Sequence, residues 1–231
     1  MKKTVLIGGN SGIGKVIYNT LKKRGDAIIK ISRSQSEFNK KNNLSADISS
    51  IEGLNKIKKN FYQKKINNII FAQRYRGNNS MEEYKVMVES TDNLIKLFKR
   101  NLLKNSSIII LSSIASTTVV PEQNASYHYT RGALETLVKY YACNLGNKNI
   151  RINCIQATTV FKPENKFFYN KKNITRKILE KITPLKRMGS SQDIANIIDF
   201  LTSDKSSYIT GTTIPVDGGL RLVSQASICK N

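Results

Sequence analysis

The amino-terminal segment constrains the fold more than any other part of the sequence. The apolar run Val5–Ile7 leads directly into the glycine-rich run Gly8–Gly14, and apolar residues at helical spacing follow until Gly25 provides a stop signal. A strand that passes through a tight glycine turn into a helix gathers backbone N–H groups at one point, where partial positive charge favours an anion. The sequence therefore predicts a strand, a phosphate-binding turn and a helix, in this order.

Three of the four glycines in the turn have predicted roles. Gly8 lets the chain reverse sharply, Gly12 lets the backbone approach a diphosphate, and Gly14 lets the helix pack closely against the strand. A dinucleotide is the ligand that this arrangement predicts. The candidate cofactor-binding residues of the turn are Gly8, Asn10, Ser11, Gly12, Ile13 and Gly14.

The rest of the chain alternates short apolar runs with amphipathic stretches, which is typical of a parallel sheet with helices on both faces. Helix starts of the capping-box type are predicted at Ser49 with Glu52 and at Ser190 with Asp193. One α/β domain over residues 1–231 accounts for the whole chain. The predicted buried strands are Lys3–Ile7, Ala27–Ser32, Asn68–Ala72, Ile108–Ser112, Ile150–Ala157 and Thr213–Val216.

Residues 158–188 interrupt this alternation. The segment combines aromatic residues, such as Phe167 and Phe168, with many lysines and has no clear strand pattern. A long aromatic segment after a strand end is typical of a lid over a pocket, so we expect a substrate lid over residues 158–188. A pair of surface helices with an aromatic edge for a partner is the alternative.

The chain is strongly basic, with 38 Lys and Arg against 16 Asp and Glu and a formal net charge of +22. Such a charge attracts polyanions, which makes a nucleic-acid-binding protein an alternative function. Lysines occur in every segment rather than in one block, however, and no nucleic-acid-binding module is recognised. We therefore expect no specific nucleic-acid partner.

Other sequence features exclude whole classes of protein. No apolar run approaches the roughly 20 residues that span a bilayer, and the first residues lack the apolar core of a signal peptide. We therefore expect a cytoplasmic protein with no membrane partner. The single histidine, His128, and the widely spaced Cys143, Cys154 and Cys229 indicate neither a metal site nor a disulfide framework.

A serine and a tyrosine carry the second strong signal. Ser113 follows the predicted strand Ile108–Ser112, and Tyr127 opens the next predicted helix, with Arg131 one turn later. Together with the glycine turn, this order resembles the short-chain dehydrogenase/reductase family along nearly the whole chain. The resemblance implies a Rossmann-type doubly wound parallel sheet flanked by helices on both faces. It also implies an oxidoreductase that moves a hydride between a nicotinamide and a carbonyl or alcohol substrate.

The resemblance assigns the catalytic roles to Ser113, Tyr127 and Arg131. Ser113 would hold the substrate oxygen, while Tyr127 would donate or accept its proton. The family has Lys where this chain has Arg131; Arg keeps the charge that lowers a tyrosine pKa and reaches the nicotinamide ribose, but it cannot give up a proton. Tyr127 and Arg131 are therefore cofactor-binding candidates as well. Tyr129 is an alternative acid on another face of the helix.

Further cofactor contacts are expected where the strands end. After the second strand an acidic residue would bind the adenosine ribose of NAD, but Ser32 and Arg33 suit the 2′-phosphate of NADP. We therefore expect NADP(H), with NAD(H) as the alternative. Asp47 and Ile48 resemble the family's adenine contact. The cofactor-binding candidates outside the turn and the catalytic group are Ser32, Arg33, Asp47, Ile48, Ala72 and Gln73.

Several family motifs are altered. Phe71–Gly77 replaces the Asn-Asn-Ala-Gly motif, Glu89 stands in the place of an active-site Asn, and Ala157 with Thr158 replaces Pro-Gly. The tail, from Pro184 to Gly219, keeps the family's order and spacing. These departures leave a second hypothesis open, in which the chain is a non-catalytic cofactor-binding or scaffold protein with the same fold.

Two expectations concern partners. Arg74, Arg76 and the lysines of residues 158–188 favour an anionic carbonyl or alcohol substrate, such as an acyl conjugate or an activated sugar. The family resemblance implies a homo-oligomer, a dimer or tetramer, that pairs through the helix around Thr136–Cys143 and the carboxyl-terminal segment.

Overall fold

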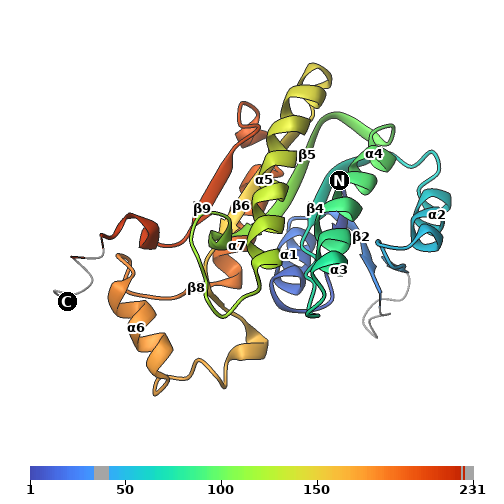
Figure 1. Cartoon of the computed structure of the whole chain (residues 1–231). Coiled ribbons are helices and arrows are strands. Elements are labelled where there is room, and N and C mark those ends of the chain that lie inside the picture. Colours follow the sequence, from blue (N-terminus) through green and yellow to red (C-terminus); the bar gives the residue numbers. More distant parts are fainter. Residues whose placement is uncertain (34–41, 225, 227–231) are drawn as a thin grey trace.

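A computed structural model describes residues 1–33, 42–224 and 226 of the chain. Ser34 and Cys229 lie outside the described residues. Seven strands form one parallel sheet in the order β3-β2-β1-β4-β5-β6-β9, so the strand order reverses direction between β1 and β4 (Figure 1). The strands are β1 (Lys3–Ile7), β2 (Ala27–Ser32), β3 (Asn43–Ser45), β4 (Ile66–Phe71), β5 (Leu102–Ser113), β6 (Arg151–Ala157) and β9 (Thr213–Val216).

The predicted doubly wound sheet is confirmed, and β1, β2 and β9 have the predicted bounds. The largest difference is β5, which begins at Leu102 rather than at Ile108. Leu102 pairs with Ile66 before a register shift, and the residues that follow it are exposed, so this half of the strand lacks the continuous apolar pattern. The short β3 was missed for a similar reason, because none of its three residues is fully buried.

Helices cover both faces of the sheet (Figure 1). One face packs against apolar side chains of α2, α4 and α5, such as Ile57, Leu94 and Leu134. The other face packs against α1 and α7 through side chains such as Ile17 and Ile198. The helices are α1 (Gly12–Lys23), α2 (Ile51–Asn60), α3 (Ser80–Tyr84), α4 (Ser90–Phe98), α5 (Ala125–Leu145), α6 (Ile174–Ile182) and α7 (Ser191–Leu201).

Two predicted helix starts have different outcomes. At α7 the capping box is present: the Ser190 hydroxyl accepts from the Asp193 N–H, and the Asp193 carboxylate accepts from the Ser190 N–H. At α2 the predicted cap Ser49 is wrong by one residue, because Ser50 accepts from the Gly53 N–H. Ser49 instead donates both its N–H and its hydroxyl to the carboxylate of Asp47.

The segment after β6 leaves the sheet and returns to it. Val160–Phe161 (β7) pairs with Gly189–Ser190 (β8), so a two-stranded parallel pair closes the base of the intervening loop. This loop carries a 3-10 turn, Pro163–Asn165, and α6, which lies beyond the main sheet (Figure 1). Residues 158–188, which were predicted as a lid, therefore form a long loop whose two ends are joined by the β7–β8 pair.

Candidate active site

The glycine turn has the backbone that its residues predict. Gly8 and Gly12 have φ angles of 83° and 54°, in the left-handed region that favours glycine. A methyl group on Gly8 would lie 2.7 Å from the Ala72 carbonyl oxygen, and one on Gly14 would collide with the Gly8 carbonyl. The turn at the start of α1 is therefore packed so tightly against β1 and β4 that only glycine fits at these two positions.

The end of β2 meets the turn through side chains. Asn10 donates a hydrogen bond to the Ser32 hydroxyl at 2.7 Å, and Ser32 lies 3.3 Å from the Asn43 side-chain oxygen. Arg33 follows Ser32 as an exposed residue. The structure thus brings the predicted residues Asn10, Ser32 and Arg33 together at the edge where the strands end, which is where ligands bind in sheets of this topology.

The predicted adenine contact lies beyond β3. The Asp47 carboxylate accepts from the N–H of Ser49 at 2.9 Å and also from the Ser49 hydroxyl. Burial would raise the pKa of Asp47, but the hydrogen bonds from Ser49 and the charge of Arg33 lower it, so the carboxylate is ionised at neutral pH. Ile48 is buried in the core, which leaves its backbone rather than its side chain as a possible cofactor contact.

Ala72 and Gln73 follow β4 and lie against the turn. The Ala72 N–H donates to the Ile7 carbonyl at 2.9 Å, which ties the two strand ends together. Gln73 donates its side-chain N–H to Thr91 at 2.9 Å, while its Oε1 is buried without a hydrogen-bond partner among the described residues. The Gln73 Oε1 can therefore accept a hydrogen bond from a polar group of a bound nucleotide.

The predicted catalytic residues converge at the same edge. Tyr127 lies in the first turn of α5 and Ser113 at the end of β5, and the guanidinium carbon of Arg131 lies 4.4 Å from the centre of the Tyr127 ring. Burial alone would raise the pKa of Tyr127. The charge of Arg131, a hydrogen bond with Ser113 and the more distant charge of Arg74 outweigh it and lower the pKa. The site therefore favours the phenolate more than water does.

Arg131 itself is buried, with 4% of its surface exposed. Its Nη2 lies 3.8 Å from the Glu83 carboxylate, and Glu83 is 5% exposed and accepts a hydrogen bond of 2.7 Å from the Ser126 hydroxyl. Because a buried charge without a partner is costly, Glu83 stabilises the position of Arg131. The Nη1 of Arg131 is buried without a hydrogen-bond partner in the described part of the chain, as a group that reaches a cofactor hydroxyl would be.

A second carboxylate fixes the strand end that carries Ser113. Glu135 accepts hydrogen bonds from the hydroxyls of Ser112 and Ser116, at 3.1 Å and 2.6 Å. Gln156 of β6 donates to the same Ser116 hydroxyl at 2.8 Å. The network joins β5, β6 and α5 beneath the site, so Ser113 projects from a rigid base.

Sequence reasoning missed two charged residues at this site, Glu83 and Glu164, which are distant in sequence from the motifs and have no local pattern that marks them. A third, Lys162, was predicted only as one of the lysines of residues 158–188. Burial lowers the pKa of Lys162, and the charges of Arg74 and Arg76 lower it further, whereas Tyr127 acts in the opposite direction. The Lys162 side chain lies against the glycine turn, with its Cδ 3.8 Å from the position of a methyl group on Gly12. Glu164 accepts a hydrogen bond of 2.6 Å from the Gly12 N–H in the glycine turn.

Three other residues have surroundings of their own. Tyr129, the alternative acid, is 50% exposed on another face of α5. Glu89 ends a π-helical turn, Lys85–Glu89, with its side chain exposed. His128 accepts from the Val120 N–H through Nε2 at 2.9 Å, so its Nδ1 carries the proton that bonds the Asn124 carbonyl. His128 thus fixes the loop before α5.

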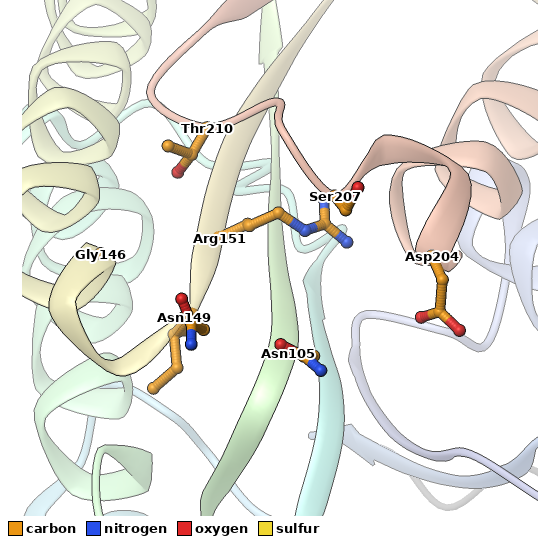
Figure 2. Close-up of a pocket in the computed structure, with 8 residues that line it drawn as sticks. Asn105, Gly146, Asn149, Arg151, Asp204, Ser207 and Thr210 are labelled. Atoms are coloured by element: carbon orange, nitrogen blue, oxygen red, sulfur yellow. The ribbon is translucent and has the colours of Figure 1, made fainter.

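A separate hollow of about 230 Å³ lies at the opposite edge of the sheet, where β6 begins (Figure 2). Arg151 extends across it toward Ser207 and Asp204 and donates to the Ser203 carbonyl at 3.1 Å. This contact ties the start of β6 to the turn after α7. The hollow is therefore not part of the candidate active site.

Comparisons with known proteins agree with this geometry. Residues 67–221 match the family model described as enoyl-(acyl carrier protein) reductase. Tropinone reductase homolog At5g06060 of Arabidopsis thaliana is 31% identical over 94% of this chain and 91% of that protein. L-xylulose reductase of Bos taurus is 27% identical over 94% of this chain and 96% of that protein. With the homolog At2g29370 the identity is 38%, but the match spans 46% of that protein, or about half its length.

The fold also matches solved structures. The crystal structure of a short chain dehydrogenase family protein from Francisella tularensis has a TM-score of 0.83 and 26% sequence identity. The match covers 96% of this chain and 100% of that one. Within residues 1–33, 42–224 and 226, no helix is long and apolar enough to cross a bilayer.

Proposed function

The chain belongs to the short-chain dehydrogenase/reductase family of oxidoreductases, and on that premise we propose that it is an NADP(H)-dependent enzyme that interconverts a carbonyl compound and its alcohol. The observation that carries the proposal is the position of Tyr127 beside both Ser113 and Arg131, with a lowered pKa. A tyrosine in this state exchanges protons near neutral pH more readily than a free one.

The chain's own residues perform the proton chemistry. The Ser113 hydroxyl holds the substrate oxygen, and the Tyr127 hydroxyl donates its proton to that oxygen in reduction or accepts it in oxidation. The buried charge of Arg131 stabilises the phenolate that reduction leaves behind. A nicotinamide dinucleotide held by the glycine turn and Arg131 would provide the hydride chemistry. Because Arg131 cannot release its proton, the phenolate is reprotonated from solvent or from another group rather than from Arg131.

The residues of the turn fit a dinucleotide. Gly8 and Gly14 leave no room for a side chain, and the first N–H groups of α1 face the turn. NADP(H) is favoured over NAD(H) because the exposed guanidinium of Arg33 follows Ser32 at the end of β2, where a 2′-phosphate needs charged donors. The end of β2 has Ser32 and Arg33 instead of an acidic residue, whose carboxylate would bind the free ribose hydroxyls of NAD.

An anionic substrate is the further part of the proposal. Arg74 and Arg76 are exposed after β4, and Lys162, on the loop after β7, lies against Gly12 of the glycine turn. These three cations favour a substrate that carries a carboxylate or a phosphate, including a thioester-linked conjugate with such a group. We also propose a cytoplasmic homo-oligomer, a dimer or tetramer, because exposed apolar side chains such as Tyr140 of α5 and Leu222 are available for pairing.

A non-catalytic role is the second candidate, and the contact between Glu164 and Gly12 favours it. A carboxylate at the glycine turn occupies a position that a diphosphate needs. In that case the chain would keep the family's fold while its own side chain fills the cofactor site.

The two candidates are separated by NADPH oxidation assays with a panel of anionic and neutral carbonyl compounds, on the native chain and on Tyr127→Phe. The proposed enzyme oxidises NADPH with at least one carbonyl, and Tyr127→Phe loses about a hundredfold or more of kcat while it still binds NADPH. Equal turnover by the two chains would reject the role of Tyr127. If the native chain is inactive and Arg131→Lys restores turnover, the non-catalytic candidate is correct.

A further inference from the structure

The carboxylate of Glu164 bonds to the part of the glycine turn that meets a dinucleotide. Its Oε1 accepts a hydrogen bond of 2.6 Å from the N–H of Gly12, the first residue of α1. A methyl group on Gly12 would lie 4.0 Å from Oε2 of the same carboxylate and 3.8 Å from Cδ of Lys162. The loop after β7 thus rests directly on the turn.

The contact has the chemistry of an anion site that is filled from within the chain. The N–H groups at the start of α1 carry partial positive charge, and both carboxylate and diphosphate oxygens accept from them. Burial would raise the pKa of Glu164, but the hydrogen bond from Gly12 and the charges of Lys162 and Lys15 lower it. Glu164 is therefore ionised at neutral pH and makes the strong, charge-assisted form of this hydrogen bond.

The loop holds Glu164 in place without burying it. The Asn165 side chain accepts from the Lys162 N–H at 2.6 Å and donates to the Val160 carbonyl at 3.2 Å. Below this turn, Val160 and Phe161 pair with Gly189 and Ser190. Glu164 itself is exposed, so its side chain can leave the turn while the paired base of the loop stays where it is.

We propose that Glu164 is an internal competitor of the cofactor diphosphate, and that its carboxylate must leave the Gly12 N–H before a dinucleotide binds. The proposal rests on the proposed function, because it concerns the same cofactor site. It makes the apparent affinity for cofactor depend on the fraction of molecules in which Glu164 has left the turn. It also makes the loop that carries Lys162 and Glu164 respond to cofactor binding.

The test is a fluorescence titration of the full chain with NADPH, comparing the native protein with Glu164→Gln and Glu164→Ala. Glu122→Gln is the matched control, because Glu122 also follows a proline and is exposed, but lies in the loop before α5. The proposal predicts that both Glu164 variants bind NADPH about tenfold tighter than the native chain, since a neutral or absent acceptor competes less well. Glu122→Gln should bind as the native chain does.

Amide hydrogen exchange of Gly12 without cofactor provides a second readout that does not depend on binding. The exchange should be faster in Glu164→Ala than in the native chain, because the acceptor is gone. Two results would overturn the proposal: unchanged Gly12 exchange in Glu164→Ala, or native-like NADPH affinity in both Glu164 variants. Neither result would contradict the proposed function. Failure of every variant to bind NADPH or NADH would overturn the proposed function and this proposal with it. Binding by the Glu164 variants alone would support this proposal, but it would favour the non-catalytic candidate over the proposed enzyme.

Discussion

The guanidinium of Arg131 lies over the ring of Tyr127, with 4.4 Å between its central carbon and the ring centre. One helical turn separates the two residues on α5, so the same face of the helix carries both. The Arg131 charge is the largest of the influences that lower the pKa of Tyr127, against a burial that would raise it. Arg131 therefore provides the same positive charge beside the tyrosine as the Lys that the family has at this position.

The pH dependence of alcohol oxidation should report this arrangement. Oxidation needs the Tyr127 phenolate, so kcat/KM should rise with pH through the pKa of Tyr127, which Arg131 holds below the ordinary tyrosine value. Arg131→Met removes the charge and should shift the rise to higher pH, whereas Arg131→Lys should shift it much less. The measurement is kcat/KM against pH for the three proteins. An identical profile in Arg131→Met would contradict the assignment.

The pair of Glu83 and Arg131 should contribute to stability. Glu83→Gln leaves a buried guanidinium without its counter-charge, so we expect unfolding to cost about 3 kcal/mol less than in the native chain. Urea denaturation monitored by circular dichroism measures the difference. Glu82→Gln is the control, because Glu82 is an exposed neighbour on the same short helix and should change stability by less than about 0.5 kcal/mol. Equal effects at the two positions would show that the pair is not stabilising.

The cysteines should differ sharply in reactivity. Cys154 is buried in β6, and burial together with the charge of Glu135 raises the pKa of its thiol to about 12, whereas Cys143 is exposed on α5. At pH 8 the thiolate fraction of Cys154 is then on the order of a thousandfold below that of an ordinary cysteine. Iodoacetamide labelling followed by peptide mass spectrometry should find Cys143 modified and Cys154 unmodified until denaturant is added. Early labelling of Cys154 in the folded chain would contradict its buried position.

The sequence predicted the fold because its local patterns carry the necessary information. The glycine turn and the apolar runs of β1, β2 and β9 were confirmed at the predicted positions. Where the pattern weakens, as in the exposed first half of β5 or the short β3, the pairing partner rather than the local sequence decides the strand. The cap of α2 was misplaced because Ser49 and Ser50 are equally good cap residues. They differ only in the fold, where Ser49 binds the Asp47 carboxylate and the Ser50 hydroxyl accepts from the Gly53 N–H.

The site was predictable only where its residues belong to a motif. Tyr127 and Arg131 share one helix face as their spacing predicts, and Ser113 meets Tyr127 as the family resemblance implies. Glu83 and Glu164 reach the same edge from other elements, and an acidic residue in a short helix or a loop has no pattern that reveals its partner. Their contacts with Arg131 and Gly12 depend on the tertiary fold alone.

The central claim is that the glycine turn and the end of β2 bind NADP(H). The most direct test is a side-by-side fluorescence titration with NADPH and NADH, on the native chain, on Glu164→Gln and on Arg33→Ala. We expect saturable binding that favours NADPH by about tenfold or more, and we expect Arg33→Ala to lose this preference, because the guanidinium supplies charged donors to the 2′-phosphate. Tighter binding of NADH, or no binding of either dinucleotide by the native chain and by Glu164→Gln, would contradict the account.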